Sequence, residues 1–314
     1  MAARETSSEP KPKPRYRMAA AKAFELRGVK LSHEDKQLWP GITKRDLALY
    51  YEAVAEWMLP HIKGRPCSIV RAPDGVSGEH FFQRHAMPGQ SKFITQVNVS
   101  NDRKPYLQID SVEALIAAAQ TAALELHPWN CSPGDPETPG RLVFDLDPAP
   151  DVPFARVIEG AKEVRDRLSA IGLESFCKTT GGKGLHVVTP LAKSKALDWP
   201  QAKAFARTLC EQMAADAPDL YLVNMSKSVR GGKIFLDYLR NDRTATAAAP
   251  LSPRARDGAT VSMPLTWAQV GARLDPAKYN LKMAPALIAK SQAWDGYDKA
   301  ARALAPAAKK LGVR

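Results

Sequence analysis

Residues 141–148 read RLVFDLDP, an apolar run that carries two carboxylates. Successive side chains of a strand point to opposite faces, so Asp145 and Asp147 are expected to project together from one face. Two adjacent buried carboxylates repel each other and need a positive partner. The alternative is a strand end at which both acids reach water beside Pro148.

A second segment, KIFLDYL at residues 233–239, places Asp237 inside another apolar run. Three carboxylates on two core strands could bind two Mg²⁺ or Mn²⁺ ions, because these ions prefer oxygen ligands. Such a centre suits in-line phosphoryl or nucleotidyl transfer. The alternative is an ordinary salt bridge from Asp237 to Lys233, which projects from the same face, or to Arg240.

The loop in KTTGGKGLHVVTP, residues 178–190, has the composition of a phosphate-binding turn. Its glycines permit a tight turn with exposed backbone N–H groups, and Thr180, Lys183 and His186 add polar groups that could hold a triphosphate. It is not a Walker loop, since GxxxxGK[ST] is absent, and a plain hairpin turn is the alternative. Arg230 and Arg254 lie in basic segments further on, and such cations would neutralise nucleotide phosphates.

Composition limits the function classes. The 314 residues are 45% hydrophobic, enough to bury a sizeable core, and 45 Lys plus Arg against 33 Asp plus Glu give a net charge of +12. This charge favours a polyanionic partner, nucleic acid first and an anionic membrane second. We expect no membrane span and, because MAARETSSEPKPKPRYR lacks an apolar signal core, a cytoplasmic, nucleoid-associated protein. The four cysteines form no CxxC pair, which argues against a zinc knuckle or a disulfide framework.

The pattern of apolar residues predicts an α/β (α+β) fold with a mixed β-sheet core and flanking helices. Residues 1–20, rich in Lys and Pro, are expected to form a flexible tether, and residues 21–314 a single domain. Thr43 is expected to cap the first helix and Pro60 to end it. Helices are predicted at 43–59, 112–126, 154–171 and 200–215, and a helical and loop-like tail from about 271. Strands are predicted at 67–71, 81–84, 142–147, 175–179, 185–189 and 233–239.

Four ordered motifs carry a family resemblance: FDLDP, TTGGKGLHVVTPL, SKSVRGGKIFLDYLRN and TATAAAPLSPRAR. Together they resemble the polymerase domain of bacterial DNA ligase D, a member of the archaeo-eukaryotic primase superfamily, from about residue 29 to 277. The resemblance implies a primase-polymerase-like catalytic fold. Within it, an N-terminal DNA-end-binding part would reach to about 130, a catalytic part would span about 131–270, and a helical tail would follow.

The resemblance also implies an activity. The protein would be a template-directed nucleotidyltransferase that fills gaps and extends broken DNA ends in non-homologous end joining. It would use nucleoside triphosphates, prefer ribonucleotides, take two Mn²⁺ or Mg²⁺ ions, and act beside Ku and a DNA ligase. No KxDG ligase motif and no phosphoesterase histidine cluster occurs in the sequence, so sealing and end-trimming are expected of other chains or domains.

Site residues follow from the same resemblance, motif by motif. Asp145, Asp147 and Asp237 would be the metal ligands and catalytic residues. His127, in ALELH at the end of a predicted helix, would be an active-site histidine; an ordinary helix C-terminal histidine is the alternative. The family often has Ser where Thr180 stands, so a hydroxyl is retained. The nucleotide would be contacted by Thr180, Lys183, His186, Arg230, Arg254 and His127.

Contacts to DNA are implied near the N-terminus. Lys36 and Lys44 would bind a 5′-phosphate across a gap, and the start of a helix near Lys44 would reinforce anion binding. Phe81 and Phe82 would stack on template bases, although strand alternation places at least one of them in the core. Two rival functions stay open: a two-metal nuclease that uses water as the nucleophile, and a non-catalytic DNA-end-binding module.

Overall fold

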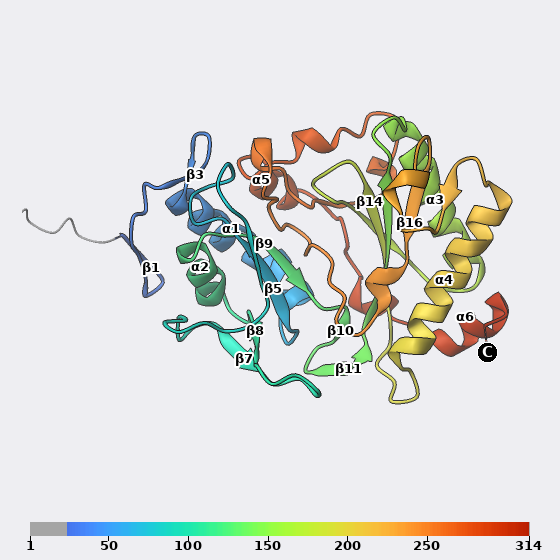
Figure 1. The fold of residues 1–314 in the computed structure, drawn as a ribbon, viewed down its shortest axis with the longest axis horizontal. Coiled ribbons are helices and arrows are strands. Elements are labelled where there is room, and N and C mark those ends of the chain that lie inside the picture. The colour runs from blue at the N-terminus through green and yellow to red at the C-terminus, as the bar shows by residue number, and fades with distance from the viewer. Residues whose placement is uncertain (1–23, 314) are drawn as a thin grey trace, which may run out of the picture.

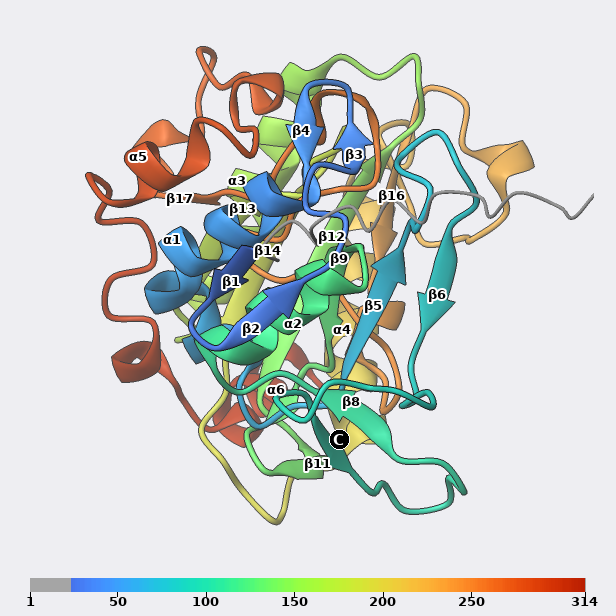
Figure 2. The same ribbon diagram turned by 90° about the vertical axis from the view of Figure 1, so that its left-hand side faces the viewer.

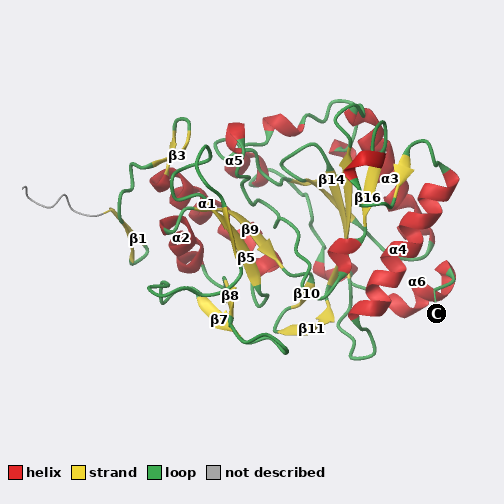
Figure 3. Cartoon of the chain, in the orientation of Figure 1, coloured by secondary structure: helices red, strands yellow, loops and turns green. Residues whose placement is uncertain are grey.

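A computed structural model describes residues 24–313, so the tether predicted for residues 1–20 lies outside the described part. Helices and sheets are mixed along the chain, which confirms the predicted α/β (α+β) class. A six-stranded sheet with its helices lies on one side of the molecule, and a three-stranded sheet with two helices lies on the other (Figure 1; Figure 3).

The larger sheet has the strand order β15-β16-β12-β14-β13-β17. All neighbouring pairs are antiparallel except β15 and β16, which are parallel, so the sheet is mixed as predicted. Its strands are β12 (Arg141–Pro148), β13 (Phe176–Thr179), β14 (Leu185–Pro190), β15 (Tyr221–Leu222), β16 (Ile234–Asp237) and β17 (Pro264–Leu265).

One face of this sheet is covered by helices. The helices α3 (Phe154–Ala170) and α4 (Trp199–Asp216) match the predicted segments closely, and both pack on β12. Gly160 of α3 lies so near the sheet that a Cβ there would meet Leu146 Cδ2 at 2.9 Å. Because Leu146 points to this helical face, the alternate residue Asp145 points to the opposite face.

The N-terminal helices are α1 (Lys44–Ile62) and α2 (Val112–Gln120), which pack against each other. Thr43 caps α1 in a capping box with Asp46, as predicted. Pro60 does not end the helix. It removes one N–H from the last turn, yet the N–H of Lys63 still bonds the carbonyl of Leu59 at 2.9 Å, so the helix continues for two residues beyond the proline.

The second helix is shorter than predicted. It ends at Gln120, the chain turns at Ala122 with a φ of 55°, and the rest of the predicted helix is a strand. This strand pairs with a neighbour, and the hydroxyl of Tyr51 donates to the carbonyl of Ala123 at 2.9 Å, so tertiary contacts override the helical pattern. The three-stranded sheet comprises β5 (Cys67–Arg71), β6 (Phe81–Gln83) and β9 (Ala123–Pro128), in the order β6-β5-β9.

Short elements complete the described chain, and no helix in residues 24–313 is long and apolar enough to cross a membrane. The two-stranded hairpins pair β1 (Phe24–Leu26) with β2 (Val29–Leu31), β3 (Gln37–Trp39) with β4 (Ile42–Thr43), β7 (Thr95–Val97) with β8 (Tyr106–Gln108), and β10 (Cys131–Ser132) with β11 (Asp135–Pro139). The C-terminal part holds α5 (Ala284–Ile288) and α6 (Leu304–Leu311). Short 3₁₀ helices lie at Lys227–Val229, Leu239–Asn241, Asp257–Ala259, Trp267–Gln269, Pro276–Lys278 and Asp298–Ala300.

Residues 244–263, coloured orange in Figure 1, run between the two sheets, and we call this segment the strap. The N–H of Ala249 bonds Leu126 of β9 at 2.9 Å, and the carbonyl of Met263 accepts from Thr179 of β13 at 2.9 Å. Figure 2 shows the same arrangement from the side of α1 and α2. The strap therefore bonds to both sheets.

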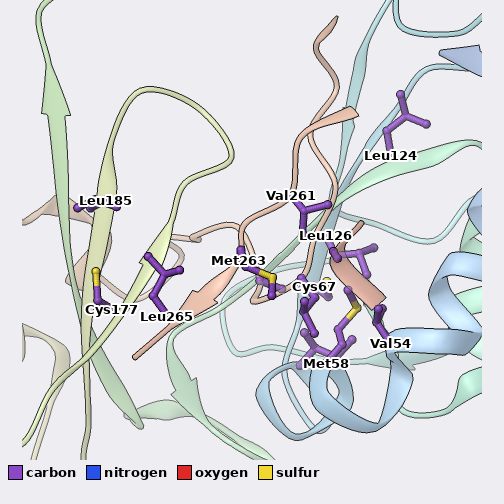
Figure 4. Packing of buried hydrophobic residues seen from close by; sticks show 14 of the residues in the cluster. Val54, Met58, Cys67, Leu124, Leu126, Cys177, Leu185, Val261, Met263 and Leu265 are labelled. Carbon is purple, nitrogen blue, oxygen red and sulfur yellow. The ribbon is translucent and has the colours of Figure 1, made fainter. Parts of the chain in front are cut away.

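A continuous apolar core connects the two sides. Figure 4 shows Val54 and Met58 of α1 packed near Leu126 of β9 and near Val261 and Met263 of the strap. The cluster continues to side chains of β13, β14 and β17, so both sheets share one core. All four cysteines are buried and free: Cys67, Cys131, Cys177 and Cys210.

Candidate active site

Asp145 and Asp237 face each other across neighbouring strands. They are direct register partners on β12 and β16, and each is about nine-tenths buried. Because facing residues of an antiparallel pair project from the same side of the sheet, their carboxylates lie together. Arg240 bridges them, with Nη2 3.2 Å from Asp145 and Nε 3.1 Å from Asp237. Of the two salt bridges that the sequence offered to Asp237, the one to Arg240 exists. Lys233 donates instead to the carbonyl of Pro218.

Asp147 lies on the same face of β12 but nearer to solvent, with 54% of its side chain exposed. Arg230 pairs with it at 2.8 Å, and the guanidinium of Arg230 lies over the ring of Phe235. Each of the three carboxylates thus has an arginine partner. The sequence had offered Arg240 as a partner for Asp237, but it specified none for Asp145 or Asp147.

Burial and neighbouring charges shift the pKa values of Asp145 and Asp237 in opposite directions. Burial raises the pKa of Asp237, and the negative charges of Asp145 and Asp147 raise it further against the opposing charge of Arg240. For Asp145, burial also acts to raise the pKa, but His186 and Arg240 hold it well below its usual range. The site therefore contains crowded negative charge that a cation would stabilise.

The donors present here fit a divalent metal ion. Carboxylate oxygens are the ligands that Mg²⁺ and Mn²⁺ prefer, and the guanidinium of Arg240 already occupies the place of a cation between Asp145 and Asp237. Within the described residues, however, no three His, Cys, Asp or Glu side chains are gathered closely enough to hold an ion as they stand. The metal-binding role of the three aspartates stays a prediction.

A row of polar residues crosses the sheet at this level. Lys178, His186, Asp145 and Asp237 are successive register partners on β13, β14, β12 and β16. Lys178 is 2% exposed, and its Nζ lies 2.8 Å from His186 Nδ1, while His186 Nε2 lies 3.3 Å from Asp145. Burial lowers the pKa of Lys178 well below its usual value. Sequence reasoning missed Lys178, although its position at the start of the glycine motif would have paired it with His186 in a hairpin.

The glycine-rich loop is a hairpin between β13 and β14 and also lines the cavity described below. Two of its backbone N–H groups are not exposed for a ligand, contrary to expectation, because the Thr180 hydroxyl accepts from Gly182 at 3.1 Å and from Gly184 at 3.2 Å. A Cβ on Gly184 would lie 2.2 Å from the carbonyl oxygen of Leu146. Thr180 therefore shapes the loop, and glycine is required where the loop crosses β12.

A cavity of about 310 Å³ opens beside these residues. It gathers seven of the residues that the sequence singled out, together with Arg240 and Arg256 from the basic segments. Asp237 and Arg230 do not line the cavity. Each pairs with a residue that does, Asp237 with Arg240 and Arg230 with Asp147. The predicted residues in the lining are His127, Asp145, Asp147, Thr180, Lys183, His186 and Arg254.

His127 lies on β9 rather than at a helix end, so the alternative of a helix C-terminal histidine is wrong. Its Nε2 lies 2.6 Å from Oε2 of Glu125, on the same face two residues earlier. Burial lowers the pKa of His127. Glu125, which the sequence reasoning missed, also lies 3.0 Å from Nε of Arg254, and Arg254 donates to the carbonyl of Thr180. Reading ALELHP as a strand would have placed Glu125 beside His127.

Lys36 and Lys44 meet at a second cavity of about 260 Å³, which His33 and Arg71 also line. Lys36 pairs with Asp74 at 2.8 Å, and Lys44, the first residue of α1, donates to the carbonyl of Ser32 at 2.8 Å. Burial, aided by the nearby charge of Lys36, lowers the pKa of Lys44. The arrangement is a cationic pocket at a helix N-terminus.

Phe81 and Phe82 are both exposed, at 45% and 50%, so the expectation that one lies in the core is wrong. They lie on β6, an edge strand that pairs only with β5, and strand alternation buries a ring only where a second layer covers it. The Phe82 ring lies edge-on to His127 at 6.0 Å, and Arg84 lies over it at 5.5 Å. Two exposed aromatic rings, which we call the aromatic step, thus lie beside the cavity.

A mixed sheet that presents paired carboxylates beside a basic cavity and a glycine-rich hairpin places the chain among nucleotidyltransferases of the primase-polymerase class. The chain belongs to the family described as LigD, primase-polymerase domain, whose model matches residues 43–294. This confirms the resemblance drawn from the four motifs.

Relatives and a solved structure agree with this assignment. The chain is 37% identical over 271 residues to a multifunctional non-homologous end joining protein LigD of Pseudomonas aeruginosa, covering 85% of this chain and 32% of the relative. A LigD protein of Mycobacterium tuberculosis is 40% identical over 261 residues, covering 79% of this chain and 34% of the relative. The chain spans about a third of the length of these relatives.

The structural match is to a polymerase domain from Mycobacterium tuberculosis ligase D in complex with DNA. The TM-score is 0.79 at 36% sequence identity, over 87% of this chain and 99% of that chain.

Proposed function

We propose that this chain is a template-directed polymerase that joins a nucleotide to the 3′-hydroxyl of a DNA primer at gaps and broken ends. The observation that carries the proposal is the cavity whose lining combines Asp145 and Asp147 with the cations Lys183, Arg254 and Arg256, which we call the basic wall. Acids and cations around one cavity suit a metal-bound triphosphate, and the family is a nucleotidyltransferase family.

Asp145, Asp147 and Asp237 would hold two divalent ions, Mg²⁺ or Mn²⁺. When bound, such ions activate the attacking hydroxyl and neutralise the departing pyrophosphate. Arg240 and Arg230 now balance the same carboxylates, so binding of metal and nucleotide would require these arginines to exchange partners. His186, fixed by Lys178, keeps Asp145 oriented toward the cavity.

The basic wall would bind the nucleotide. Lys183 and Arg254 present positive charge to the phosphates, and the hydroxyl of Thr180 holds the hairpin so that Lys183 stays at the cavity. His127 and Arg230 would complete the contacts, His127 from β9 and Arg230 once it leaves Asp147. We include a preference for ribonucleotides in the proposal on the strength of the family resemblance alone.

DNA would lie across both cavities. Lys36 and Lys44 form the cationic pocket proposed for the 5′-phosphate on the far side of a gap, at the N-terminus of α1. The exposed rings of Phe81 and Phe82 would stack on template bases. On this assignment residues up to about 130 bind the DNA end, residues 131–270 carry the chemistry, and the two parts form one domain with a helical tail.

The relatives' names suggest a wider context. They are non-homologous end joining proteins roughly three times as long as this chain, so we propose that the polymerase works with a DNA ligase domain and with Ku at chromosomal breaks. A net charge of +12 favours association with the nucleoid.

The experiment that tests the function is extension of a labelled primer on a gapped duplex. Product should lengthen only when nucleoside triphosphate and Mg²⁺ or Mn²⁺ are both present, and chelation should stop it. Separate reactions with ribonucleotides, deoxyribonucleotides and each metal would measure both preferences.

Two other outcomes would overturn the proposal. Shortening of the primer without nucleotide would identify the two-metal nuclease. DNA binding with no change in primer length under any condition would identify the chain as a non-catalytic DNA-end-binding module.

A further inference from the structure

A single buried carboxylate outside the aspartate cluster holds two side chains of the nucleotide cavity. Glu125 of β9 is 6% exposed, and its Oε2 lies 2.6 Å from His127 Nε2 and 3.0 Å from Arg254 Nε. Its other oxygen accepts the backbone N–H of Ala255 at 2.7 Å. We propose that Glu125 is a positioning residue that sets the orientation of both His127 and Arg254 toward the bound nucleotide. This inference rests on the proposed polymerase function.

The contact to Arg254 determines how its guanidinium is presented. Nε lies 3.0 Å from Glu125 Oε2 in an ion pair that lacks hydrogen-bond geometry, and Nη1 donates to the carbonyl of Thr180 in the glycine hairpin. Two of the three nitrogens are thereby directed into the protein, and the third can be offered to a phosphate oxygen at the cavity, which Arg254 lines. Without the carboxylate, rotation about the long side chain would be opposed only by the bond to Thr180.

The contact to His127 holds an imidazole that also lines the cavity. Binding of Nε2 by Glu125 sets the plane of the ring, and the ring lies edge-on to the exposed Phe82 at 6.0 Å. The hydrogen bond to His127 and the positive charge of Arg254 lower the pKa of Glu125 to about 2 against the effect of burial. Glu125 is therefore charged at neutral pH and can hold both partners at once.

Attachment of the strap to β9 does not depend on this side chain alone. The N–H of Ala249 bonds the carbonyl of Leu126 at 2.9 Å, and the N–H of Leu126 bonds the hydroxyl of Ser252 at 2.9 Å. These bonds would survive a change at Glu125. The expected effect of such a change is a misaligned pair of cavity residues in an otherwise intact fold.

The test compares Glu125→Ala and Glu125→Gln with wild type in gapped-duplex extension. Because one buried, charge-assisted contact is worth about tenfold in binding, we expect Glu125→Ala to raise the KM for nucleotide about tenfold, with a smaller fall in kcat and unchanged affinity for DNA. Glu125→Gln keeps an acceptor for Ala255 but loses the charge, so its KM should fall between the two. Glu163→Gln, which alters a carboxylate paired with Arg167 and Tyr221 away from the cavity, should leave KM unchanged.

A double variant separates positioning from general destabilisation. If Glu125 acts through Arg254, the changes Glu125→Ala and Arg254→Ala together should raise KM by less than the product of their separate effects. Full multiplicativity, or a wild-type KM in both Glu125 variants, would overturn the inference. Should Glu125→Ala fail to fold, Glu125→Gln decides the question.

Direct binding keeps this inference distinguishable from the proposed function. Titration with a non-hydrolysable nucleoside triphosphate and Mg²⁺ measures affinity without catalysis. A wild type that binds the analogue but never extends a primer would end the polymerase proposal. Weaker binding of the analogue by Glu125→Ala would still support the positioning role, and equal binding would refute it.

Discussion

The two cationic cavities of this protein are built differently. In the nucleotide cavity, charged groups sit on register partners of a regular sheet and are tied to one another, as in the row from Lys178 to Asp237. In the cavity of Lys36 and Lys44, the cations come from a loop and a helix start, and their hydrogen-bonded partners are the exposed Asp74 and a backbone carbonyl. Substitutions should therefore act cooperatively in the first cavity and separately in the second.

The largest effect is expected at the aspartates of the sheet. Asp145→Asn or Asp237→Asn should lower primer extension by about three orders of magnitude, because loss of metal charge stabilisation removes several kcal/mol from the transition state. DNA affinity should stay near wild type. The measurement is single-turnover extension beside a gel-shift assay, with Glu163→Gln as the matched acidic control. Extension within tenfold of wild type would contradict the expected difference in sensitivity between the two cavities.

Acid should destabilise the packing around His61, near the C-terminal end of α1, where its ring contacts Trp294 and Tyr297. Burial, with the nearby charges of Arg141, Arg65 and Lys178, lowers the pKa of His61 to about 3 from 6.5. Between these values the unfolded chain binds more protons than the folded one, so stability falls as pH falls. From pH 7 to 4.5, wild type should lose about 2–3 kcal/mol more than His61→Phe.

Denaturant unfolding at the two pH values measures this difference. His80→Gln, a change at an exposed histidine, is the control and should follow wild type. Equal pH dependence in wild type and His61→Phe would show that burial of His61 beside these cations does not govern the acid sensitivity of the protein.

A smaller and separable effect is expected at the second cavity. The double change Lys36→Ala and Lys44→Ala should lower the preference for a 5′-phosphorylated gap about tenfold. The remaining DNA binding should depend less steeply on salt concentration. Turnover on an unphosphorylated gap should not change. Lys195→Ala with Lys290→Ala, two exposed lysines elsewhere, removes the same charge and serves as control. If the control pair erased the preference equally, net charge alone would explain it.

The smallest effect is expected at the aromatic step between the cavities. Phe82→Ala should reduce extension on a short gap severalfold, since a stacked base is worth ~1–3 kcal/mol and only part of it is lost at one ring. The effect of Phe81→Ala should be weaker because only Phe82 meets His127 and Arg84. Melting temperatures should stay close to wild type, as both rings are exposed. A larger loss in Phe81→Ala would reverse the order of the two rings.

Much of the sheet could be predicted because its strands are short apolar runs. Leu142 and Phe144 are buried on one face of β12, and Asp145 points to the other face. The alternation of side chains along a strand is enough to predict this. The Thr43 cap was equally readable, because a side-chain oxygen followed three residues later by an acid is a local signal.

The region around His127 could not be predicted from periodicity. Ala-rich sequence from Val112 onward fits a helix, and no glycine or proline marks the break at Ala122, which takes a positive φ without either. The strand exists because β5 offers a partner, and pairing partners far apart in sequence leave no local trace. For the same reason, the role of Glu125 and the contact of Arg240 with Asp145 could not be predicted.

Because Asp145 and Asp237 are register partners, catalysis depends on the register of β16 against β12. A slip of β16 by a single residue would turn Leu236 toward the cavity and bury the carboxylate among helix side chains. Residues inserted between Leu222 and Asn224, ahead of Arg230, should be harmless if the ladder re-forms in the same frame, whereas one residue added within β16 should abolish activity while leaving a folded protein.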